Sequence, residues 1–324
     1  PSAARITACA AALAAALLCA GGALAQAWPA KPVKIIVPLA AAGTGDTLAR
    51  VVSEEMGRIL GQPFLVENRP GSGGSLGAEA VSRAAPDGYT LLSASPSHVI
   101  IPAMRAKVGY DPLKDFIPIT VIAYTHQLIV GHPSVPASTV PQLIAYLKQN
   151  PGRLNYGSAG SGSATHLNME LFKAMSGTFI VHIPYRGSTQ ARQDLLAGEV
   201  QFAVDGLIPT LPLIRAGKLR AYALCSSRRS PIAPEIPTLD EAGVKGYASD
   251  TWYGMMAPAG TPPGIIAALH AAALKAIHTP AVRERLTAQG AELIGNTPDE
   301  FRALLEKEQQ LWARVIKLSG AKED

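Results

Sequence analysis

Residues 33–60, VKIIVPLAAAGTGDTLARVVSEEMGRIL, hold the pattern that decides the fold. The first seven residues are mostly β-branched or otherwise apolar, which predicts a buried strand over 33–39. From Asp46 to Leu60 the apolar side chains recur every three or four positions, which predicts an amphipathic helix that Gly61 ends. A strand that leads through a short loop of small residues into a helix is one unit of an α/β fold.

The same alternation of strand and helix continues along the chain. It predicts strands over 64–67 and 89–94 with a helix over 75–85 between them, an order that indicates a parallel sheet. After a stretch interrupted by prolines, from Pro96 to Pro136, a second series begins. That series predicts helices over 140–148, 165–175 and 191–196, and strands over 154–158, 179–183 and 200–204. The sequence therefore predicts an α/β protein with two lobes.

Three further helices are predicted near the C-terminus, each opened by a Thr-Pro pair. In this pattern the threonine caps the helix and the proline takes its first position. The pairs are Thr261-Pro262, Thr279-Pro280 and Thr297-Pro298. The last pair is followed by Asp299 and Glu300, which completes a capping box.

The composition is that of a globular chain. Of 324 residues, 48% are hydrophobic and 16% are charged, so each of two domains can bury a core. Lys and Arg number 29 against 24 Asp and Glu, but no basic run is longer than the pair Arg228 and Arg229. This pattern gives no stripe of positive charge for nucleic acid, and we expect no nucleic-acid partner.

The first 27 residues have the pattern of a secretory signal peptide. Arg5 precedes an uncharged, Ala- and Leu-rich run to Ala20, and a stretch of small residues follows. We expect cleavage after Ala27, or alternatively after Ala25, and export to the periplasm. A membrane anchor is the other interpretation, but alanine is weakly apolar and a spanning helix needs about 20 strongly apolar residues. Removal of residues 1–27 would leave Cys225 as the single cysteine, so we expect no intramolecular disulfide.

Two loops between a strand and a helix consist of small and hydroxylated residues. The first covers 40–46 (AAAGTGD) and the second covers 157–165 (GSAGSGSAT). Small side chains let a ligand approach the backbone N–H groups that the start of a helix leaves unpaired. With the hydroxyl groups and the positive end of each helix, these groups suit a carboxylate or another small anion. One such loop in each lobe predicts a ligand clamp, although either loop alone is also typical of a tight turn.

Three residues near these loops have two interpretations each. Asp46 is expected to cap the first helix or to orient its loop. His166, near the start of a helix, is more simply explained as a structural histidine than as a catalytic one. Asp205 follows a strand and precedes Gly206, so it either faces the cleft or caps the next helix.

Motifs for catalysis, nucleotide binding and metal binding are weak. Gly73 to Gly77 matches the G-x-S-x-G pattern of a serine nucleophile, with Ser75 at its centre. A loop from Asn68 to Gly71 precedes it, where that motif needs a strand. The sequence contains no P-loop, no G-x-G-x-x-G and no H-E-x-x-H or C-x-x-C pair. We therefore expect a binding protein without cofactor or metal, and a secreted hydrolase that uses Ser75 is the alternative.

Ten short motifs, in their order along the chain, resemble the Bug family of solute-binding receptors, which includes the receptors of tripartite tricarboxylate transporters. They are residues 31–38 (KPVKIIVP), 43–46 (GTGD), 66–74 (VENRPGSGG), 85–92 (APDGYTLL), 110–116 (YDPLKDF), 154–160 (LNYGSAG), 182–187 (HIPYRG), 216–221 (AGKLRA), 236–238 (IPT) and 257–262 (APAGTP). The set extends over nearly all of the chain after the signal peptide, which makes it far more specific than any single motif.

The resemblance implies an α/β periplasmic binding protein of the type II-like, two-lobed kind, with two crossing segments between the lobes. Lobe 1 would comprise residues 28–126 and 249–324, and lobe 2 residues 127–248. Ligands of this family are typically carboxylates, held by backbone amides, hydroxyl groups and bridging waters. Carried onto this chain, the ligand-binding residues would be Ala41, Ala42, Gly43, Thr44, Ser95 and Ser97 in lobe 1, and Ser161, Ser163, Thr165, His166, Tyr185, Gly187 and Asp205 in lobe 2.

The resemblance also implies how the protein acts. A ligand that bridges both lobes favours the closed form, and a membrane transporter reads that form. A membrane sensor kinase is the alternative partner. The ligand stays open among dicarboxylates, aromatic acids and amino acids, because a backbone clamp recognises the carboxylate group and not what it is attached to. We expect the receptor to be a monomer.

Overall fold

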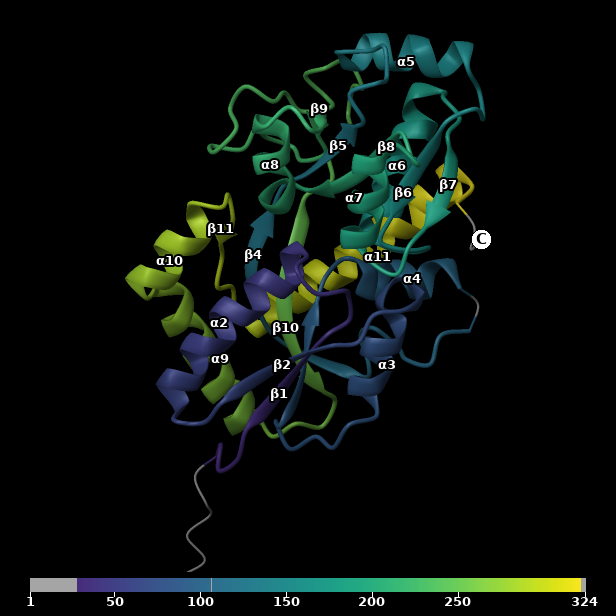
Figure 1. Cartoon of the computed structure of the whole chain (residues 1–324). Helices are drawn as coiled ribbons and strands as arrows, with labels where there is room; N and C mark the ends of the chain where they lie inside the picture. Colours follow the sequence, from purple (N-terminus) through teal and green to yellow (C-terminus); the bar gives the residue numbers. More distant parts are fainter. Residues whose placement is uncertain (1–27, 106, 322–324) are drawn as a thin grey trace, which may run out of the picture.

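The structure, a computed structural model, describes residues 28–105 and 107–321. The predicted signal peptide lies outside the described residues. Two separate β-sheets, each covered by helices, form two lobes (Figure 1). The prediction of a two-lobed α/β fold is therefore confirmed.

Lobe 1 is built on a six-stranded sheet with the strand order β11-β4-β10-β3-β1-β2. Its elements before the chain crosses to lobe 2 are β1 (Val33–Val37), α2 (Thr44–Leu60), β2 (Phe64–Asn68), a 3₁₀ turn η1 (Ser72–Gly74), α3 (Ser75–Ser82), β3 (Thr90–Ala94), α4 (Ser97–Met104) and β4 (Phe116–Thr125). Its elements after the return are β10 (Thr251–Pro258), α9 (Pro263–His278), α10 (Pro280–Thr287), β11 (Glu292–Leu293) and α11 (Pro298–Ser319).

The sheet of lobe 1 is mixed rather than parallel. β1 pairs in parallel with β2 and β3, as the alternation of strands and helices predicts. The returning strand β10 lies between β3 and β4 and is antiparallel to both. The prediction of parallel pairing is therefore confirmed for the three strands it concerned, β1, β2 and β3, whereas the antiparallel half of the sheet is made of strands that were not predicted.

Lobe 2 is built on a five-stranded sheet with the strand order β7-β6-β8-β5-β9. Its elements are β5 (Gln127–Gly131), α5 (Val140–Gln149), β6 (Asn155–Ser158), α6 (Ala164–Ser176), β7 (Val181–Pro184), α7 (Ser188–Ala197), β8 (Phe202–Gly206), α8 (Leu207–Arg215) and β9 (Arg220–Leu224). The predicted strands and helices of this lobe overlap the observed ones. β6 is parallel to β7 and β8, whereas β5 is antiparallel to β8 and β9.

Apolar side chains cover both faces of the lobe 1 sheet. On one face, Ile35 of β1 packs with Leu48 and Val52 of α2. On the other face, Trp252 of β10 packs with Phe301 of α11, with ring centroids 5.2 Å apart. Successive strand residues point to opposite faces, so two layers of helices enclose the sheet. Among the described residues, no single helix is long and apolar enough to cross a membrane, and only the bent pair of α9 and α10 combines that length and composition.

The helix ends show which capping predictions hold. Thr297 and Glu300 form the predicted capping box at the start of α11. Thr279 occupies the N-cap position of α10 and Pro280 its first position, as predicted, but the predicted side-chain cap is absent, because the Thr279 hydroxyl donates to Glu55 instead. The prediction for α9 is wrong, because Pro262 occupies the N-cap position and the Thr261 hydroxyl donates to the carbonyl oxygen of Pro258 instead.

The crossings between the two sheets are short. β4 ends at Thr125 and β5 begins at Gln127, so His126 alone separates a strand of one sheet from a strand of the other. On the return, the backbone N–H of Ser249 donates to the carbonyl oxygen of Cys225, and β10 begins two residues later at Thr251. Such short connections fix the lobes close together at one end, and the cavity lies between them.

Candidate ligand-binding site

A cavity of about 40 Å³ lies between the two lobes. Lobe 1 contributes Leu39, Ala40, Gly43, Thr44, Gly45, Asp46, Ser95, Ser97, Thr251 and Tyr253 to its lining, and lobe 2 contributes Gln127, Ala159, Ser163, Ala164, Thr165, Ser188, Asp205 and Gly206. Hydroxyl groups dominate this lining, and its two charged side chains are both carboxylates.

Five helices begin at the cavity. They are α2 and α4 of lobe 1 and α6, α7 and α8 of lobe 2, each with a residue of its cap or first turn in the lining. Four of them, α2, α4, α7 and α8, have no side-chain cap at the N-cap position. The start of a helix carries unpaired N–H groups and a partial positive charge. Their convergence makes the cavity favourable for an anion although no cationic side chain lines it.

Asp46 holds the loop before α2 in place. Its carboxylate accepts hydrogen bonds from the backbone N–H of Ala42 at 3.0 Å, from Arg50 at 3.0 Å and from Asn68 at 2.9 Å. Burial alone would raise the pKa of Asp46, but the hydrogen bonds from Arg50, Ala42 and Asn68 outweigh burial and lower it. The residue is in the first turn of α2 rather than at the N-cap, which is Gly43. Asp46 therefore orients the loop, one of the two roles considered for it.

We expect Asp46→Asn to weaken ligand binding about tenfold, since the neutral amide makes weaker hydrogen bonds to Arg50 and the Ala42 N–H and lets the loop move. Isothermal titration calorimetry with a carboxylate that binds the wild type measures the change in the dissociation constant. Glu54→Gln is the matched control, because Glu54 is an exposed residue of the same helix. Equal affinities for the two variants would show that Asp46 does not organise the binding loop.

In lobe 2 the loop before α6 is held by its own hydroxyl groups. Ser163 caps α6 by accepting a hydrogen bond from the backbone N–H of His166 at 3.2 Å. The Thr165 hydroxyl accepts from the backbone N–H of Ala159 at 2.9 Å and lies 2.9 Å from that of Ser163. These contacts bring Ser163 and Thr165 to the cavity wall in a fixed orientation.

Asp205 is a buried charged residue of the lobe 2 wall. It is 3% exposed and lies at the end of β8. Nε of Arg192 donates to its Oδ2 at 2.6 Å, Nη2 of Arg192 to its Oδ1 at 3.2 Å, and the backbone N–H of Gly206 to Oδ1 at 2.8 Å. Burial raises the pKa of Asp205, whereas the Arg192 guanidinium and the Gly206 N–H oppose that rise.

The two lobes touch across the cavity. The Thr189 hydroxyl of lobe 2 donates to the carbonyl oxygen of Ala41 in lobe 1 at 3.0 Å. The backbone N–H of Ala164 in lobe 2 donates to Oγ of Ser97 in lobe 1 at 3.3 Å. The structure is therefore a closed arrangement, and its cavity has room for a few water molecules, each of which needs about 10–15 Å³ by this measure.

Glycines allow this close approach. A Cβ atom at Gly187 would lie 2.5 Å from Cβ of Ala40, and one at Gly206 would lie 2.2 Å from Oγ1 of Thr44. Gly187 and Gly206 belong to lobe 2, whereas Ala40 and Thr44 belong to lobe 1. Neither glycine has a left-handed backbone conformation, with φ of 169° and −70°. The requirement at both positions is therefore for space between the lobes.

The structure gathers some of the predicted ligand-binding residues in the lining of the cavity and leaves others outside that lining. In the lining are Gly43, Thr44, Ser95, Ser97, Ser163, Thr165 and Asp205. Outside the lining are Ala41, Ala42, Ser161, His166, Tyr185 and Gly187. The Ala42 N–H and the Ala41 carbonyl are engaged within the protein, as described above. The Tyr185 hydroxyl donates to Asp194 at 2.6 Å, and burial together with Asp194 raises the pKa of Tyr185 to about 12.

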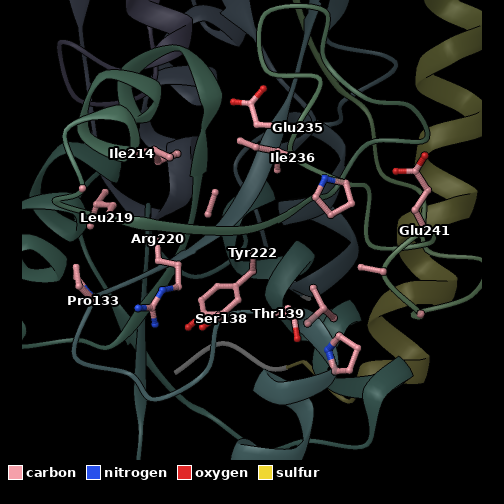
Figure 2. A pocket seen from close by; sticks show the side chains of 17 residues that line it. Pro133, Ser138, Thr139, Ile214, Leu219, Arg220, Tyr222, Glu235, Ile236 and Glu241 are labelled. Carbon is pink, nitrogen blue, oxygen red and sulfur yellow. The ribbon is translucent and has the colours of Figure 1, made fainter.

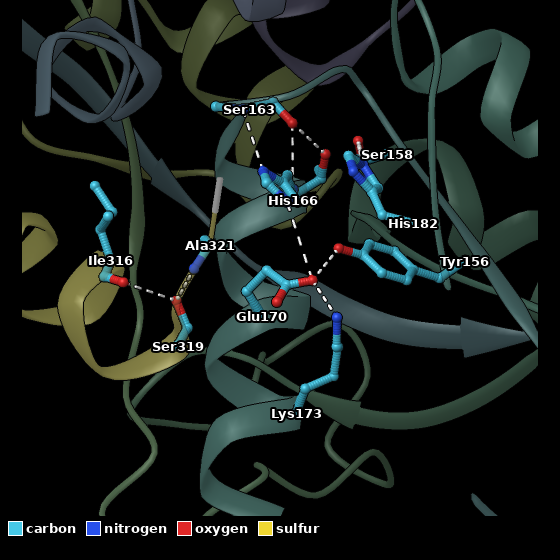
Figure 3. Close-up of polar contacts among 12 residues, drawn as sticks. Tyr156, Ser158, Ser163, His166, Glu170, Lys173, His182, Ile316, Ser319 and Ala321 are labelled. Carbon is cyan, nitrogen blue, oxygen red and sulfur yellow. Dashed lines mark hydrogen bonds and ion pairs between the residues drawn. The ribbon is translucent and has the colours of Figure 1, made fainter. Parts of the chain in front are cut away.

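His166 belongs to a polar cluster next to Ser163 of the cavity lining (Figure 3). Its ring stacks on that of His182 with centroids 4.1 Å apart, and its Nδ1 accepts from the backbone N–H of Gly162 at 3.2 Å. Glu170 of the same helix accepts hydrogen bonds from Tyr156 at 2.6 Å and from Lys173 at 2.5 Å. This position agrees with a structural role for His166.

Several lining residues were not predicted. Gly45, Ala159 and Ala164 lie inside the two loops that the sequence points to, and Ser188 and Gly206 directly follow the predicted residues Gly187 and Asp205. Gln127, Thr251 and Tyr253 carry no local signal, because they come from the two strands that cross between the sheets.

A larger hollow of about 930 Å³ lies on the outer side of lobe 2 (Figure 2). It is lined mainly by apolar side chains, among them Ile214, Leu219 and Ile236. Neither of the two loops of small residues, 40–46 and 157–165, contributes to this hollow. Its size therefore does not make it the ligand site, which needs residues from both lobes if binding is to drive closure.

Two sheets joined by short crossings, with a polar cavity and helix starts from both sides, define a two-lobed solute-binding protein. Comparison with known proteins identifies its family. The chain belongs to the family described as tripartite tricarboxylate transporter family receptor, whose profile matches residues 48–321.

Relatives support this assignment along most of the chain. The chain is 37% identical to Protein BugT of Bordetella pertussis over 300 residues, which cover 92% of each protein. It is similar to a solved structure of R. palustris Rpa4515 with adipate, with 35% identity, a TM-score of 0.88 and coverage of 92% of this chain and 100% of that one. It is also similar to MatC of Rhodopseudomonas palustris with bound malate, with 34% identity, a TM-score of 0.86 and coverage of 89% and 100%.

Proposed function

We propose that this protein is a periplasmic receptor that captures a small carboxylate between its two lobes and presents it to a membrane transporter. The observation that carries the proposal is the convergence of five helix N-termini from both lobes on one polar cavity. Two similar structures hold the carboxylates adipate and malate. A carboxylate fits such a cavity because N–H and hydroxyl donors can satisfy both of its oxygens.

The site residues of this receptor follow from the cavity. We propose that the starts of α2 and α4 hold the ligand from lobe 1 and that Ser163, Thr165 and Asp205 hold it from lobe 2. The lobes part to admit the ligand, since the closed cavity holds only a few water molecules. Residues 28–126 and 249–324 would then move as one lobe and residues 127–248 as the other.

The N-terminal pattern supports the location, and the family supports the partner. We propose that residues 1–27 direct export and are removed after Ala27. The family is one of transporter receptors, so a membrane transporter is the partner that reads the closed form.

The structure gives little support to the hydrolase alternative. Ser75 is 5% exposed, and its hydroxyl accepts a hydrogen bond from Nη1 of Arg105 at 3.3 Å. A serine nucleophile needs a base, usually histidine, within hydrogen-bond distance. Within the described part of the chain, Arg105 is the only hydrogen-bond partner of that hydroxyl. The preceding strand β2 ends at Asn68, seven residues before Ser75, so the strand–turn–helix geometry of a nucleophile elbow is missing here.

A carboxylate at 100 times its dissociation constant should raise the free energy of unfolding by about 2.7 kcal/mol, because it binds the folded state alone. A thermal-shift screen of residues 28–324 with mono-, di- and tricarboxylates, aromatic acids and amino acids, after unfolding and refolding to remove bound ligand, measures this. Uncharged amides of the same acids are the control. Stabilisation by the amides and not by the acids would refute the proposed ligand class.

A further inference from the structure

The lobe 2 wall of the cavity holds a carboxylate, although the cavity suits an anion. Asp205 lies in the lining, with its side chain 4% exposed, and the Arg192 guanidinium that pairs with it is 11% exposed. Arg192 is four residues after Ser188 on α7, so both lie on the face of that helix toward the cavity. Arg192 itself is outside the lining. A ligand that enters the cavity therefore meets the carboxylate and not its cation.

The contacts of Asp205 favour its ionised form. Arg192 binds it through two nitrogens, and a guanidinium keeps its charge at any physiological pH. A neutral Asp205 would leave that buried guanidinium without a counterion, which is strongly unfavourable. The N-terminus of α8, which starts at Leu207, adds a partial positive charge beside Asp205.

Asp205 still has room to accept another hydrogen bond. An ionised carboxylate offers about four lone-pair positions. Oδ1 accepts from Arg192 and from Gly206, whereas Oδ2 accepts from Arg192 alone among the described residues. A methylene group of the ligand placed against Oδ2 would exclude water and leave the second acceptor position of Oδ2 without a hydrogen bond. A second carboxylate at this place would be repelled by the charge of Asp205. A hydroxyl or ammonium group of the ligand would fill it.

We propose that Asp205 selects ligands that carry a hydrogen-bond donor, a hydroxyl or an ammonium group, beside the carboxylate that the helix starts hold. This inference rests on the proposed function and narrows it to hydroxy acids and amino acids. The Arg192 guanidinium positions and compensates Asp205 without contacting the ligand. Unsubstituted acids of the same length bind less tightly because they leave Oδ2 with Arg192 as its single donor and its second acceptor position unfilled.

The test is calorimetric titration of the refolded receptor with matched acids. Each set contains an unsubstituted acid and its 2-hydroxy and 2-amino forms: propionate, lactate and alanine; succinate, malate and aspartate; glutarate, 2-hydroxyglutarate and glutamate. In the set whose length fits the cavity, the better of the two substituted acids should bind at least about tenfold more tightly than the unsubstituted one. The comparison of hydroxy with amino acids identifies which donor Asp205 accepts.

A double variant, Asp205→Asn with Arg192→Gln, removes both charges together and so leaves no buried charge unpaired. It should reduce the preference for the substituted acid to about twofold or less, while thermal unfolding shows that it is folded. Glu199→Gln, a change of charge on the surface of the same lobe, should keep the preference.

The possible failures are distinguishable. If unsubstituted acids bind the wild type as tightly as their substituted forms, or if the double variant keeps the preference, the role of Asp205 is refuted and the carboxylate receptor stands. If no carboxylate of any kind binds, the proposed function fails and the inference fails with it.

Discussion

Gly187→Ala is expected to weaken ligand binding about 30-fold or more. The added Cβ would lie 2.5 Å from Cβ of Ala40 and 3.3 Å from its backbone nitrogen, so the lobes could not reach the closed arrangement without shifting a backbone segment. Overpacking of this kind costs about 1–3 kcal/mol, and about 2 kcal/mol corresponds to 30-fold in affinity. Because φ at Gly187 is 169°, alanine adopts this backbone without strain, and the loss falls on closure. Calorimetry gives the affinity, and small-angle scattering shows whether the ligand still closes the lobes.

The control for this experiment is Gly264→Ala. Gly264 lies in the first turn of α9 in lobe 1, and a Cβ there meets no atom within 4 Å. It should bind ligand like the wild type. Gly206→Ala, which directs a Cβ at Thr44 across the same gap, should weaken binding as Gly187→Ala does. If Gly187→Ala and Gly206→Ala both bound the ligand with wild-type affinity, the ligand-bound form would be more open than this structure.

The free energy of unfolding should fall by about 3 kcal/mol between pH 7 and pH 4 because of His98. Its ring is buried between Tyr110 and Phe116, and burial lowers its pKa from 6.5 to about 4, against a smaller opposing effect of the hydrogen bond to Pro112. Below pH 6.5 the unfolded chain binds a proton at this residue that the folded chain does not, so acid favours unfolding until about pH 4. At about 1.4 kcal/mol for each pH unit, the interval from 6.5 to about 4 corresponds to a loss of about 3 kcal/mol, because the folded chain is itself half protonated at His98 when the pH reaches about 4.

Urea unfolding at several pH values measures this loss, and His98→Gln isolates it. In the described structure Nδ1 of His98 has no hydrogen-bond partner, whereas Nε2 lies 3.0 Å from the carbonyl oxygen of Pro112. Glutamine keeps a donor for Pro112 and cannot be protonated, so the variant should be less stable at pH 7 but should lose less between pH 7 and pH 4. The same pH dependence in both proteins would exclude His98 as its cause.

His98 follows Ser97 of the cavity lining, so protonation of His98 in acid should also loosen the start of α4.

The parts of the fold that the sequence predicts are those set by neighbours along the chain. The unit of β1, α2 and β2 is visible from the period of its apolar residues, and the structure places its ends within two residues of the prediction. β4 is missed, because Pro118 interrupts its pattern. In the structure Pro118 pairs with Met256 of β10 next to an irregular register, where a proline is tolerated in a sheet. The insertion of β10 between β3 and β4 pairs β10 with residues of β4 that lie more than 120 positions earlier in the sequence, from Thr251 with Thr125 to Pro258 with Phe116, and no local pattern predicts this pairing.

The candidate site likewise contains residues that the local sequence indicates and residues that only the assembled fold brings to the cavity. Thr44 and Thr165 reach the cavity from loops whose composition already indicates an anion site. Tyr253 is 8% exposed and packs in the core of lobe 1, yet it also lines the cavity. Its position depends on which strand lies beside β3, which is a property of the whole sheet. The pairing of Arg192 with Asp205 likewise joins α7 to the end of β8 and has no sequence motif.

The insertion of β10 also sets the order in which the receptor can assemble. A chain delivered from its N-terminus presents β3 and β4 early, but the strand that joins them arrives with residues 251–258. The strands of lobe 2 are consecutive along the chain, from residue 127 to residue 224. The lobe 2 sheet can therefore form while the lobe 1 sheet still lacks β10 and β11. Thr251 and Tyr253 of the cavity lining arrive with the late strand. A nascent receptor therefore has no binding site until nearly its whole length has emerged, and solute capture starts only with the finished molecule.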